Sequence, residues 1–359
     1  MVQISIIIFY LKSMLSNIKY WFSIICLASL SLTSCGSDDK KDIPDVSGIQ
    51  AEATFIRFDK ALFGIDTNKV EDGLKNLETQ YPTISNSFWT AIIGAKKPNE
   101  TPPQYFPVVR QFLTDYYVRK TADTTQIVFK NFDTYQKQLN EAARFYKYYF
   151  PKNPNLTFVT FVSQYNYDVF PFGHDTIGVG LDFFLGENYQ DYMQLENARY
   201  DYVRRTLTPE HLAAKALRLH IQGMAGEGSG NRLLDIAVHN GKQLYILDKL
   251  LPNAPDSIKF GYSGAQTKWC KENEAGIWAS FLKENVLYET NFKKIAKLVT
   301  PSPNSPGMPL EAPGETGNYI GWRIVEQFMA RNPEISLPQL LILKDAQQIL
   351  TKAKYKPAK

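Results

Sequence analysis

Residues 208–250 read TPEHLAAKALRLHIQGMAGEGSGNRLLDIAVHNGKQLYILDKL and predict two helices joined by a glycine-rich connection. Thr208 is a good N-cap residue, and Pro209 suits the first helical position. The connection at residues 225–231 holds three glycines, each of which loses much backbone entropy in a helix. Leucines and other apolar residues follow at spacings of three and four. They cover a wide arc of the second helix, so we expect that helix to lie at the centre of the fold.

The segments outside this stretch predict an α+β fold that is mostly helical. Alternating apolar residues predict short strands at residues 53–59, 156–162 and 176–181. Helical spacing predicts further helices at residues 67–77, 87–93, 104–119, 132–150, 263–270, 274–287, 319–329 and 337–350. Together they predict a small sheet of about three strands packed by eight or more helices.

The first 34 residues have the pattern of a bacterial lipoprotein signal peptide. Lys12 and Lys19 precede an apolar run at residues 20–32, which is short for a membrane span. Leu32-Thr33-Ser34-Cys35 then resembles a lipobox, which predicts cleavage before Cys35 and lipidation of its thiol. Residues 35–50 predict a polar tether, and residues 51–359 a single globular domain. Met1 and Met14 are both possible starts.

The composition is that of a packed globular protein. Hydrophobic residues make up 44% of the chain and aromatic residues 13%. The formal charge of +4 is close to neutral for 359 residues, so nucleic acid is not an expected partner. Lipidation of Cys35 and loss of Cys26 leave Cys270 alone, which excludes an internal disulfide in the exported domain.

The motifs contain no credible catalytic set. A helical zinc protease needs His-Glu-x-x-His, which places two histidines one turn apart beside a general base. The corresponding residues 220–224 have His220 and no second histidine or glutamate. Ser229 lies outside a Gly-x-Ser-x-Gly motif. An unusual metal site from His220, His239 and Glu227 is the alternative that the sequence leaves open.

The chain resembles the gliding-motility lipoprotein GldB family of Bacteroidetes over most of its exported part. The residues that carry this resemblance are Phe55-Ile56-Arg57-Phe58-Asp59, Tyr81-Pro82, Gly180-Leu181-Asp182-Phe183-Phe184-Leu185-Gly186, Leu234-Asp235, Gly241-Lys242-x-Leu244-Tyr245, Asn273-Glu274-x-x-Ile277-Trp278, Pro313-Gly314-x-Thr316-Gly317-Asn318-Tyr319-Ile320-Gly321-Trp322-Arg323-Ile324-Val325 and Lys354-Tyr355-Lys356-Pro357. The layout is also similar to that of predicted zinc proteases with a His-Glu-x-x-His helix followed by a Glu-Gly helix. Asn240-Gly241 stands at the Glu-Gly position in this chain, so the resemblance implies a degenerate zincin-like core without metal or cofactor.

We therefore expect a non-catalytic, membrane-anchored lipoprotein that supports gliding motility or related envelope machinery. The expected partners are the membrane, through the N-terminal lipid, and proteins of that machinery, bound on a pseudo-peptidase scaffold. The expected location is the inner or outer membrane, on its periplasmic or surface face. The alternatives are a residual zinc-dependent metallohydrolase and a lipoprotein that binds glycans or peptides.

Overall fold

The computed structural model describes residues 43–196 and 198–358. Contacts divide the chain into two units, Met1–Pro44 and Asp45–Lys359, and the helices and strands of the described residues belong to the second unit. The predicted signal peptide, Cys35 and most of the predicted tether lie outside the described residues. Among the helices that the structure describes, none combines the length and apolarity that a membrane crossing requires.

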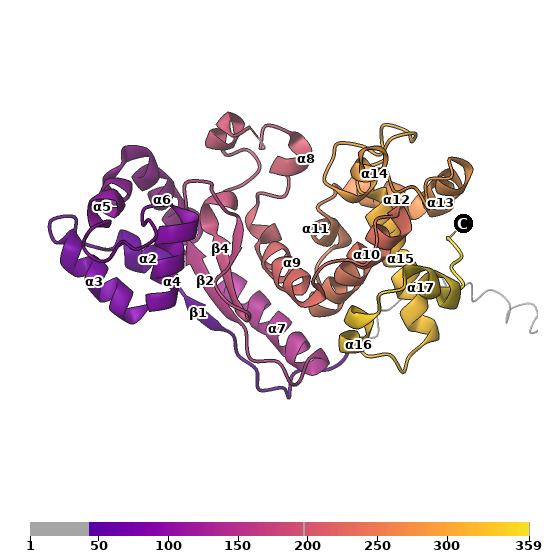
Figure 1. Ribbon diagram of the computed structural model, residues 1–359, viewed down its shortest axis with the longest axis horizontal. Helices are drawn as coiled ribbons and strands as arrows, with labels where there is room; N and C mark the ends of the chain where they lie inside the picture. Colours follow the sequence, from indigo (N-terminus) through magenta and orange to yellow (C-terminus); the bar gives the residue numbers. More distant parts are fainter. Residues whose placement is uncertain (1–42, 197, 359) are drawn as a thin grey trace, which may run out of the picture. The chain divides into compact units, whose positions relative to one another are not determined.

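A four-stranded mixed sheet lies in the N-terminal half of the unit (Figure 1). Its strands are β1 (Thr54–Ile56), β2 (Thr157–Phe161), β3 (Val169–Pro171) and β4 (Thr176–Gly180). The order is β1-β2-β4-β3, with β1, β2 and β4 parallel and β3 antiparallel to β4. The three predicted strands are confirmed. The sequence did not predict β3, which has three residues and ends in Pro171 at an edge, where proline is tolerated in a sheet.

The predicted strand at residues 53–59 is too long, because α2 begins at Phe58. Thr54–Ile56 pairs with β2, and Asp59 is fully buried in α2. The Asp59 carboxylate accepts hydrogen bonds from the Arg57 Nε at 2.9 Å, the Gln126 Nε2 at 2.8 Å and the Thr160 hydroxyl. These contacts fix the start of the helix through residues far away in the sequence.

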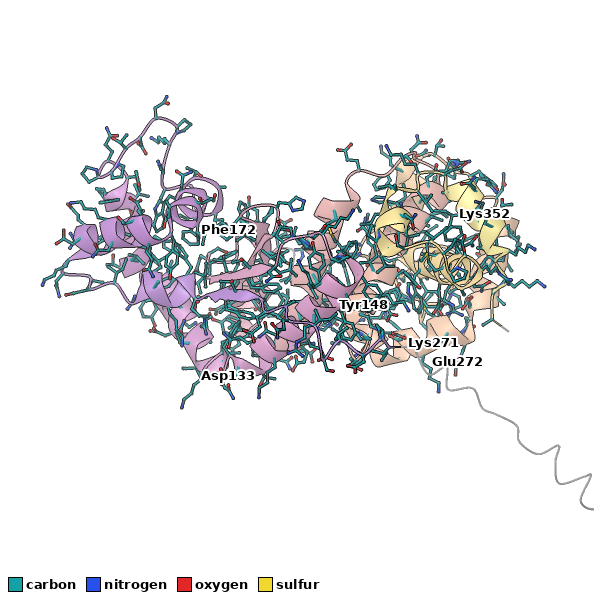
Figure 2. All side chains as sticks on the ribbon, turned by 90° about the horizontal axis from the view of Figure 1, so that it is seen from below. Asp133, Tyr148, Phe172, Lys271, Glu272 and Lys352 are labelled. Carbon is teal, nitrogen blue, oxygen red and sulfur yellow. The ribbon has the colours of Figure 1, made fainter. Side chains whose placement is uncertain are left out.

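Most of the helices between β1 and β2 build a core of their own against one face of the sheet. The helices of this segment are α2 (Phe58–Phe63), α3 (Val70–Gln80), α4 (Pro82–Ser87), a π-helical turn (Phe88–Ile92), α5 (Phe106–Thr114), α6 (Tyr116–Val128) and α7 (Asp133–Tyr149). Phe58, Trp89 and Phe106 are buried in this core with Val159 and Phe161 of β2. Phe172, labelled in Figure 2, follows β3 and completes it. Helix α7 packs in the other, larger core.

The second face of the sheet joins that larger core. Phe158, Ile177 and Val179 point to this side and are buried with apolar residues of α7 and of the C-terminal helices. Gly178 of β4 faces the opposite side, where a Cβ would come within 2.6 Å of the Phe172 ring and 2.9 Å of the Phe161 ring. The small residue therefore lets two aromatic rings pack directly on the strand.

The C-terminal half of the unit is helical. Its helices are α8 (Asp201–Arg204), α9 (Leu212–Ala225), α10 (Leu233–Leu250), α11 (Asp256–Phe260), α12 (Gly264–Glu272), α13 (Glu274–Lys283), α14 (Phe292–Val299), α15 (Thr316–Arg331), α16 (Leu337–Ile342) and α17 (Ala346–Ala353), with short 3-10 turns at Leu181–Phe183, Gln190–Gln194 and Pro209–His211. The prediction of a mostly helical α+β fold is confirmed.

Helix α10 is the central helix of this half, as its wide apolar arc predicts. Its buried residues include Leu233, Val238 and Leu244 together with Asp235 and Lys242. It packs so closely on α15 that a Cβ at Gly241 would lie 2.2 Å from the carbonyl carbon of Gly321. Glycines at this crossing let the two backbones approach each other.

The two predicted helices of residues 208–250 are confirmed, with a correction at the start. Pro209–His211 is a 3-10 turn, and α9 begins at Leu212. The Thr208 hydroxyl lies 3.0 Å from His211 Nδ1 and does not cap a backbone N–H. The glycine connection ends α9 at Gly226, whose φ of 60° excludes a further helical residue.

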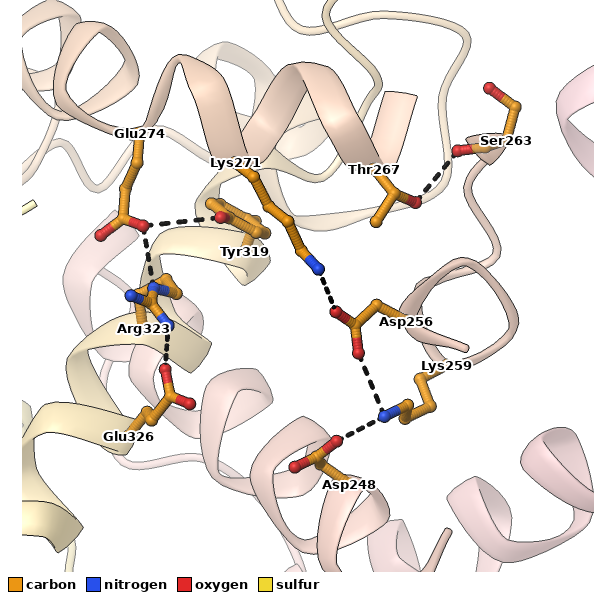
Figure 3. Close-up of polar contacts among 10 residues, drawn as sticks. All are labelled: Asp248, Asp256, Lys259, Ser263, Thr267, Lys271, Glu274, Tyr319, Arg323 and Glu326. Carbon is orange, nitrogen blue, oxygen red and sulfur yellow. Dashed lines mark hydrogen bonds and ion pairs between the residues drawn. The ribbon is translucent and has the colours of Figure 1, made fainter. Parts of the chain in front are cut away.

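A buried glutamate ties the C-terminal tail to α13 and α15. Glu274 is 1% exposed and accepts hydrogen bonds from the Arg323 Nε at 2.8 Å, the Tyr355 hydroxyl at 2.9 Å and the Ala358 N–H at 3.3 Å. Figure 3 shows its contacts to Arg323 and Tyr319 of α15. A buried carboxylate is stable only with such partners, so this site fixes the end of the chain.

Candidate functional site

The candidate site is a pocket of about 310 Å³ against one side of α9, which we call the α9 pocket. Its charged and polar lining includes Arg205, His211, Lys215, Arg218, Lys259, Gln266 and Glu315. Its apolar walls include Val203, Ala214, Ile258, Phe260, Pro301 and Pro313. Thus α9, α11 and the loop that leads into α15 each contribute to the lining of this pocket. A mostly apolar hollow with a few convergent polar groups is the usual form of a ligand site.

Helix α9 presents three neighbouring side chains to the pocket. Ala214 and Arg218 are four residues apart and so lie on one face, with Lys215 beside them. The opposite face of the helix is buried in the large core through Ala213 and Ala216. Lys215 forms an ion pair with Asp168 at 3.0 Å and lies 5.6 Å from the centre of the Phe184 ring. Its charge therefore already has a partner in the protein.

The guanidinium of Arg218 is held less firmly. Its Nη2 lies 3.9 Å from Oε1 of Glu315, which is beyond hydrogen-bond distance. Its side chain is 31% exposed, and it makes no hydrogen bond with the residues that the structure describes. An arginine has five N–H donors in a planar fork, so Arg218 offers unused donors at the pocket wall.

Glu315 faces Arg218 from a strained backbone position. Its φ of 60° and ψ of 23° are left-handed, a region that a residue other than glycine adopts at a cost. The side chain is only 14% exposed, and its Oε1 accepts a hydrogen bond from Asn318 Nδ2 at 2.8 Å. Burial raises the pKa of the Glu315 carboxyl, while Arg218 and Asn318 act in the opposite direction. Non-glycine residues with this backbone cluster at functional sites.

The loop around Glu315 is fixed from two sides. The Tyr262 hydroxyl donates to the carbonyl oxygen of Gly314 at 2.9 Å. A Cβ at Gly314 would lie 2.2 Å from the Ser302 hydroxyl oxygen, so only glycine fits there. These contacts hold Glu315 in place at the start of α15.

Lys259 lines the pocket, but its charge is neutralised behind the wall. Figure 3 shows it between Asp248 and Asp256, with Lys271 on the far side of Asp256. The distance from Lys259 Nζ to Asp256 Oδ1 is 3.1 Å, and Lys271 Nζ lies 2.7 Å from Asp256 Oδ2. Burial raises the pKa of Asp256, but the hydrogen bonds and charges of the two lysines outweigh it and lower the value to about 2. Lys259 is therefore a structural part of the wall.

His211 is the one histidine that lines the pocket among the described residues. It is 7% exposed, and its Nδ1 lies 3.0 Å from the Thr208 hydroxyl. Its Nε2 has no hydrogen-bond partner among the described residues. Burial, assisted by the charge of Lys215, lowers the pKa of His211 to about 4, so the ring is neutral at pH 7.

The residues of the alternative metal site do not come together. His220 is buried against the Tyr146 ring, with 5.0 Å between the ring centres, and burial lowers its pKa. His239 lies on α10 beside Gly228, and Glu227 is exposed. Within residues 43–196 and 198–358, no three His, Cys, Asp or Glu side chains form a group that could hold a metal ion.

The sequence did not reveal the part of α9 that faces the pocket. Residues 220–224 correspond to His-Glu-x-x-His in the sequence, but His220 and Met224 face Tyr146 of α7. Ala214, Lys215 and Arg218 instead occupy the pocket side at the first, second and fifth positions of one segment. These are the spacings of the His, Glu and His in that motif.

Asn240, which the sequence places at the Glu-Gly position, is linked to the pocket. Its Nδ2 donates to Asn318 Oδ1 at 2.9 Å, and Asn318 Nδ2 donates in turn to Glu315. Asn240 therefore helps to orient the groups around Glu315. Cys270 is buried and free, and burial raises its pKa to about 12, so it is unreactive.

A comparison with protein families finds one matching family model, described as gliding motility protein GldB, over residues 39–357. No curated protein and no solved structure matches the chain. The family match covers the whole α9 pocket. The similarity to zinc proteases, and with it the zincin-like core, stays a prediction from the sequence.

Proposed function

Because the chain belongs to the family of gliding motility protein GldB, we propose that it is a non-catalytic, lipid-anchored envelope protein that supports gliding by binding partners. The observation that carries this proposal is the family match, which spans residues 39–357. A link to gliding motility follows from the family itself. The lipid anchor, the lack of catalysis and the binding of partners go beyond the family match and are our proposals.

The proposed anchor rests on the N-terminal sequence. Two lysines, an apolar run and the segment Leu32-Thr33-Ser34-Cys35 follow in the order of a lipoprotein signal. Several acyl chains, at about 0.8 kcal/mol per buried CH₂ group, would hold the protein durably at a membrane. The partners would then be proteins of the envelope or gliding machinery that meet it there.

The lack of catalysis is supported by the chemistry of the α9 pocket. A zinc peptidase needs imidazole ligands and a carboxylate base, whereas this face of α9 offers a methyl group, an ammonium and a guanidinium from Ala214, Lys215 and Arg218. A protonated lysine or arginine has no lone pair to give a metal and repels a dication. Asn240, at the position of the expected third ligand, already donates to Asn318.

The binding role is supported by what the same pocket retains. It is hollow, it has apolar walls, and it presents Arg218 without a hydrogen bond to the described residues. Glu315, which lies beside Arg218, has a left-handed backbone conformation. Strain of this kind, with unused donors, favours a role in recognition over one in stability.

A deletion strain of the host bacterium tests the proposal. We expect loss of gliding, restored by the intact chain and not by Cys35→Ser, which removes the acceptor thiol. Immunoblots of membrane and soluble fractions show whether each chain is made and where it is found. Normal gliding of the deletion strain would contradict the function, and a Cys35→Ser chain that stays in the membrane fraction would contradict the anchor.

A further inference from the structure

We propose that the α9 pocket binds a carboxylate with an apolar body, and that Arg218 is the residue that holds the carboxylate. This inference rests on the proposed binding role and names its ligand chemistry. Nothing in the family description specifies a ligand. The charges, the walls and the shape of the pocket all favour this chemistry.

Arg218 is the one cation of the described pocket lining whose donors make no hydrogen bond to the protein. Lys215 is paired with Asp168 at 3.0 Å, and Lys259 is paired with Asp248 and Asp256. The guanidinium of Arg205 donates to Gln266, which is a neutral acceptor. Glu315 is the one acid among the described lining residues, and it lies 3.9 Å from Arg218.

Glu315 leaves the hydrogen-bond donors of Arg218 free for a ligand. Its Oε1 accepts a hydrogen bond from Asn318, and burial disfavours its charged form. The guanidinium of Arg218 can therefore donate two hydrogen bonds to a carboxylate of a ligand, in the bidentate geometry that arginine favours. With Arg205 on the same pocket lining, the site carries a surplus of positive charge that suits one anionic group.

The walls specify the rest of the ligand. When a carboxylate lies beside Arg218, the rest of the ligand is surrounded by apolar side chains, which include Val203, Ile258, Phe260 and Pro313. An apolar body is therefore favoured over a sugar or a phosphate ester. The volume of about 310 Å³ suits a small group. Sites of this size lie at the lower end of the range for small ligands.

A neighbouring pocket indicates that the ligand extends further. It has a volume of about 450 Å³ and shares Arg205 and Tyr262 with the α9 pocket. Its other lining residues include Asn188, Asp201 and Ser263, which are polar. An apolar end pocket beside a polar one fits the last residue of a peptide chain and the backbone that precedes it. A free small acid would present the same carboxylate, and the experiment separates these two sources.

The test is a titration of the full-length chain in detergent with four probes. The probes are acetyl-Ala-Ala-Ala-Leu and acetyl-leucine, each as the free acid and as the amide. We expect the acid of at least one pair to bind about tenfold or more tightly than its amide, because hydrogen bonds to a charged group contribute about 1.5–3 kcal/mol. Tighter binding of the peptide acid identifies a peptide C-terminus, and equal binding of both acids identifies a small acid.

Variants connect the effect to Arg218. Arg218→Gln should weaken binding of the acid about tenfold and remove the difference from the amide. Arg331→Gln, at an exposed arginine in the last turn of α15, is the matched control and should leave both values unchanged. Equal binding of acid and amide by the intact chain, no binding of any probe, or an unaltered Arg218→Gln affinity would overturn the inference.

The comparison of acid and amide uses the intact chain, so it decides the question even if Arg218→Gln does not fold. It also separates this inference from the proposed function. A deletion strain that cannot glide, together with a chain that binds acid and amide equally, would leave the function standing and reject the carboxylate.

Discussion

Arg218 Nη2 and Glu315 Oε1 lie 3.9 Å apart at the wall of the α9 pocket, close enough to attract each other and too far apart for a hydrogen bond. The two side chains come from distant parts of the sequence and meet because α9 packs beside the loop that begins α15. An external anion would compete with Glu315 for the same guanidinium. The balance between these two carboxylates determines how well the pocket binds.

Glu315→Gln should therefore strengthen the binding of a carboxylate ligand. The amide oxygen can still accept the hydrogen bond from Asn318 Nδ2, while the negative charge beside Arg218 is removed. We expect a severalfold tighter affinity at pH 8, where the native carboxylate competes most, and a smaller change at pH 5, because burial raises the pKa of Glu315. Titrations of both chains with the peptide acid at the two pH values measure this. Weaker binding by Glu315→Gln would show that Glu315 itself contacts the ligand.

Asp182 should make the stability of the protein fall between pH 4 and pH 8. Burial raises its pKa to about 6, although backbone N–H groups of Tyr165 and Ser163 oppose the shift. The folded value is above the value of 3.8 for the free group, so the stabilising proton is present at low pH and is lost as pH rises through 6.

Asp182→Asn removes this dependence. The Asn oxygen can still accept the two backbone hydrogen bonds, and no charge is buried at high pH. Relative to the intact chain, the variant should gain about 2 kcal/mol of unfolding free energy between pH 4 and pH 8. Urea unfolding at both pH values measures the difference. A difference between the two chains that does not change with pH would mean that Asp182 titrates normally.

Gly241→Ala should destabilise the protein through the crossing of α10 and α15. The new Cβ would lie 2.2 Å from the carbonyl carbon of Gly321, so the helices must separate. Overpacking of this kind costs about 1–3 kcal/mol.

Gly223→Ala on α9 is the matched control. It is exposed, and a Cβ there meets nothing within 4 Å. Its helix propensity should stabilise the chain by up to about 1 kcal/mol. The two variants should therefore shift the midpoint of urea unfolding in opposite directions. Equal midpoints would contradict the close crossing.

The purified full-length chain should retain no zinc after exposure to an equimolar amount and desalting. His220, His239 and Glu227 do not form a group of three, and the pocket face of α9 carries cations. Elemental analysis gives the answer directly. One zinc per chain that is lost on His220→Ala would restore the metallohydrolase alternative.

The spacing of apolar residues predicted most of the helices and strands, because apolar side chains recur where an element faces the core. The wide apolar arc predicted for α10 and the helical spacing of residues 132–150, which form α7, both match helices of the large core. The pattern failed where tertiary contacts override it. Alternation runs through Phe58 and Asp59, yet these residues start α2, because Thr160 and Gln126 bind the Asp59 carboxylate across 101 and 67 positions.

The α9 pocket could not be predicted from local patterns. Arg218 has the appearance of an ordinary exposed residue on an amphipathic helix, and Glu315 that of a loop residue before a helix. The pocket exists only because α11 and the loop before α15 pack against α9. Histidine is a common metal ligand and made His220 a candidate in the sequence, but its burial against Tyr146 gives it a packing role.

The most direct test of the account is gliding of a deletion strain that carries Arg218→Glu. The charge reversal places two carboxylates at the pocket wall and should repel an anionic ligand. We predict that this strain does not glide, whereas Arg331→Glu, made at the same level and anchored equally by immunoblot, restores gliding. Gliding of the Arg218→Glu strain as fast as that of the intact chain would show that the α9 pocket is not the functional site.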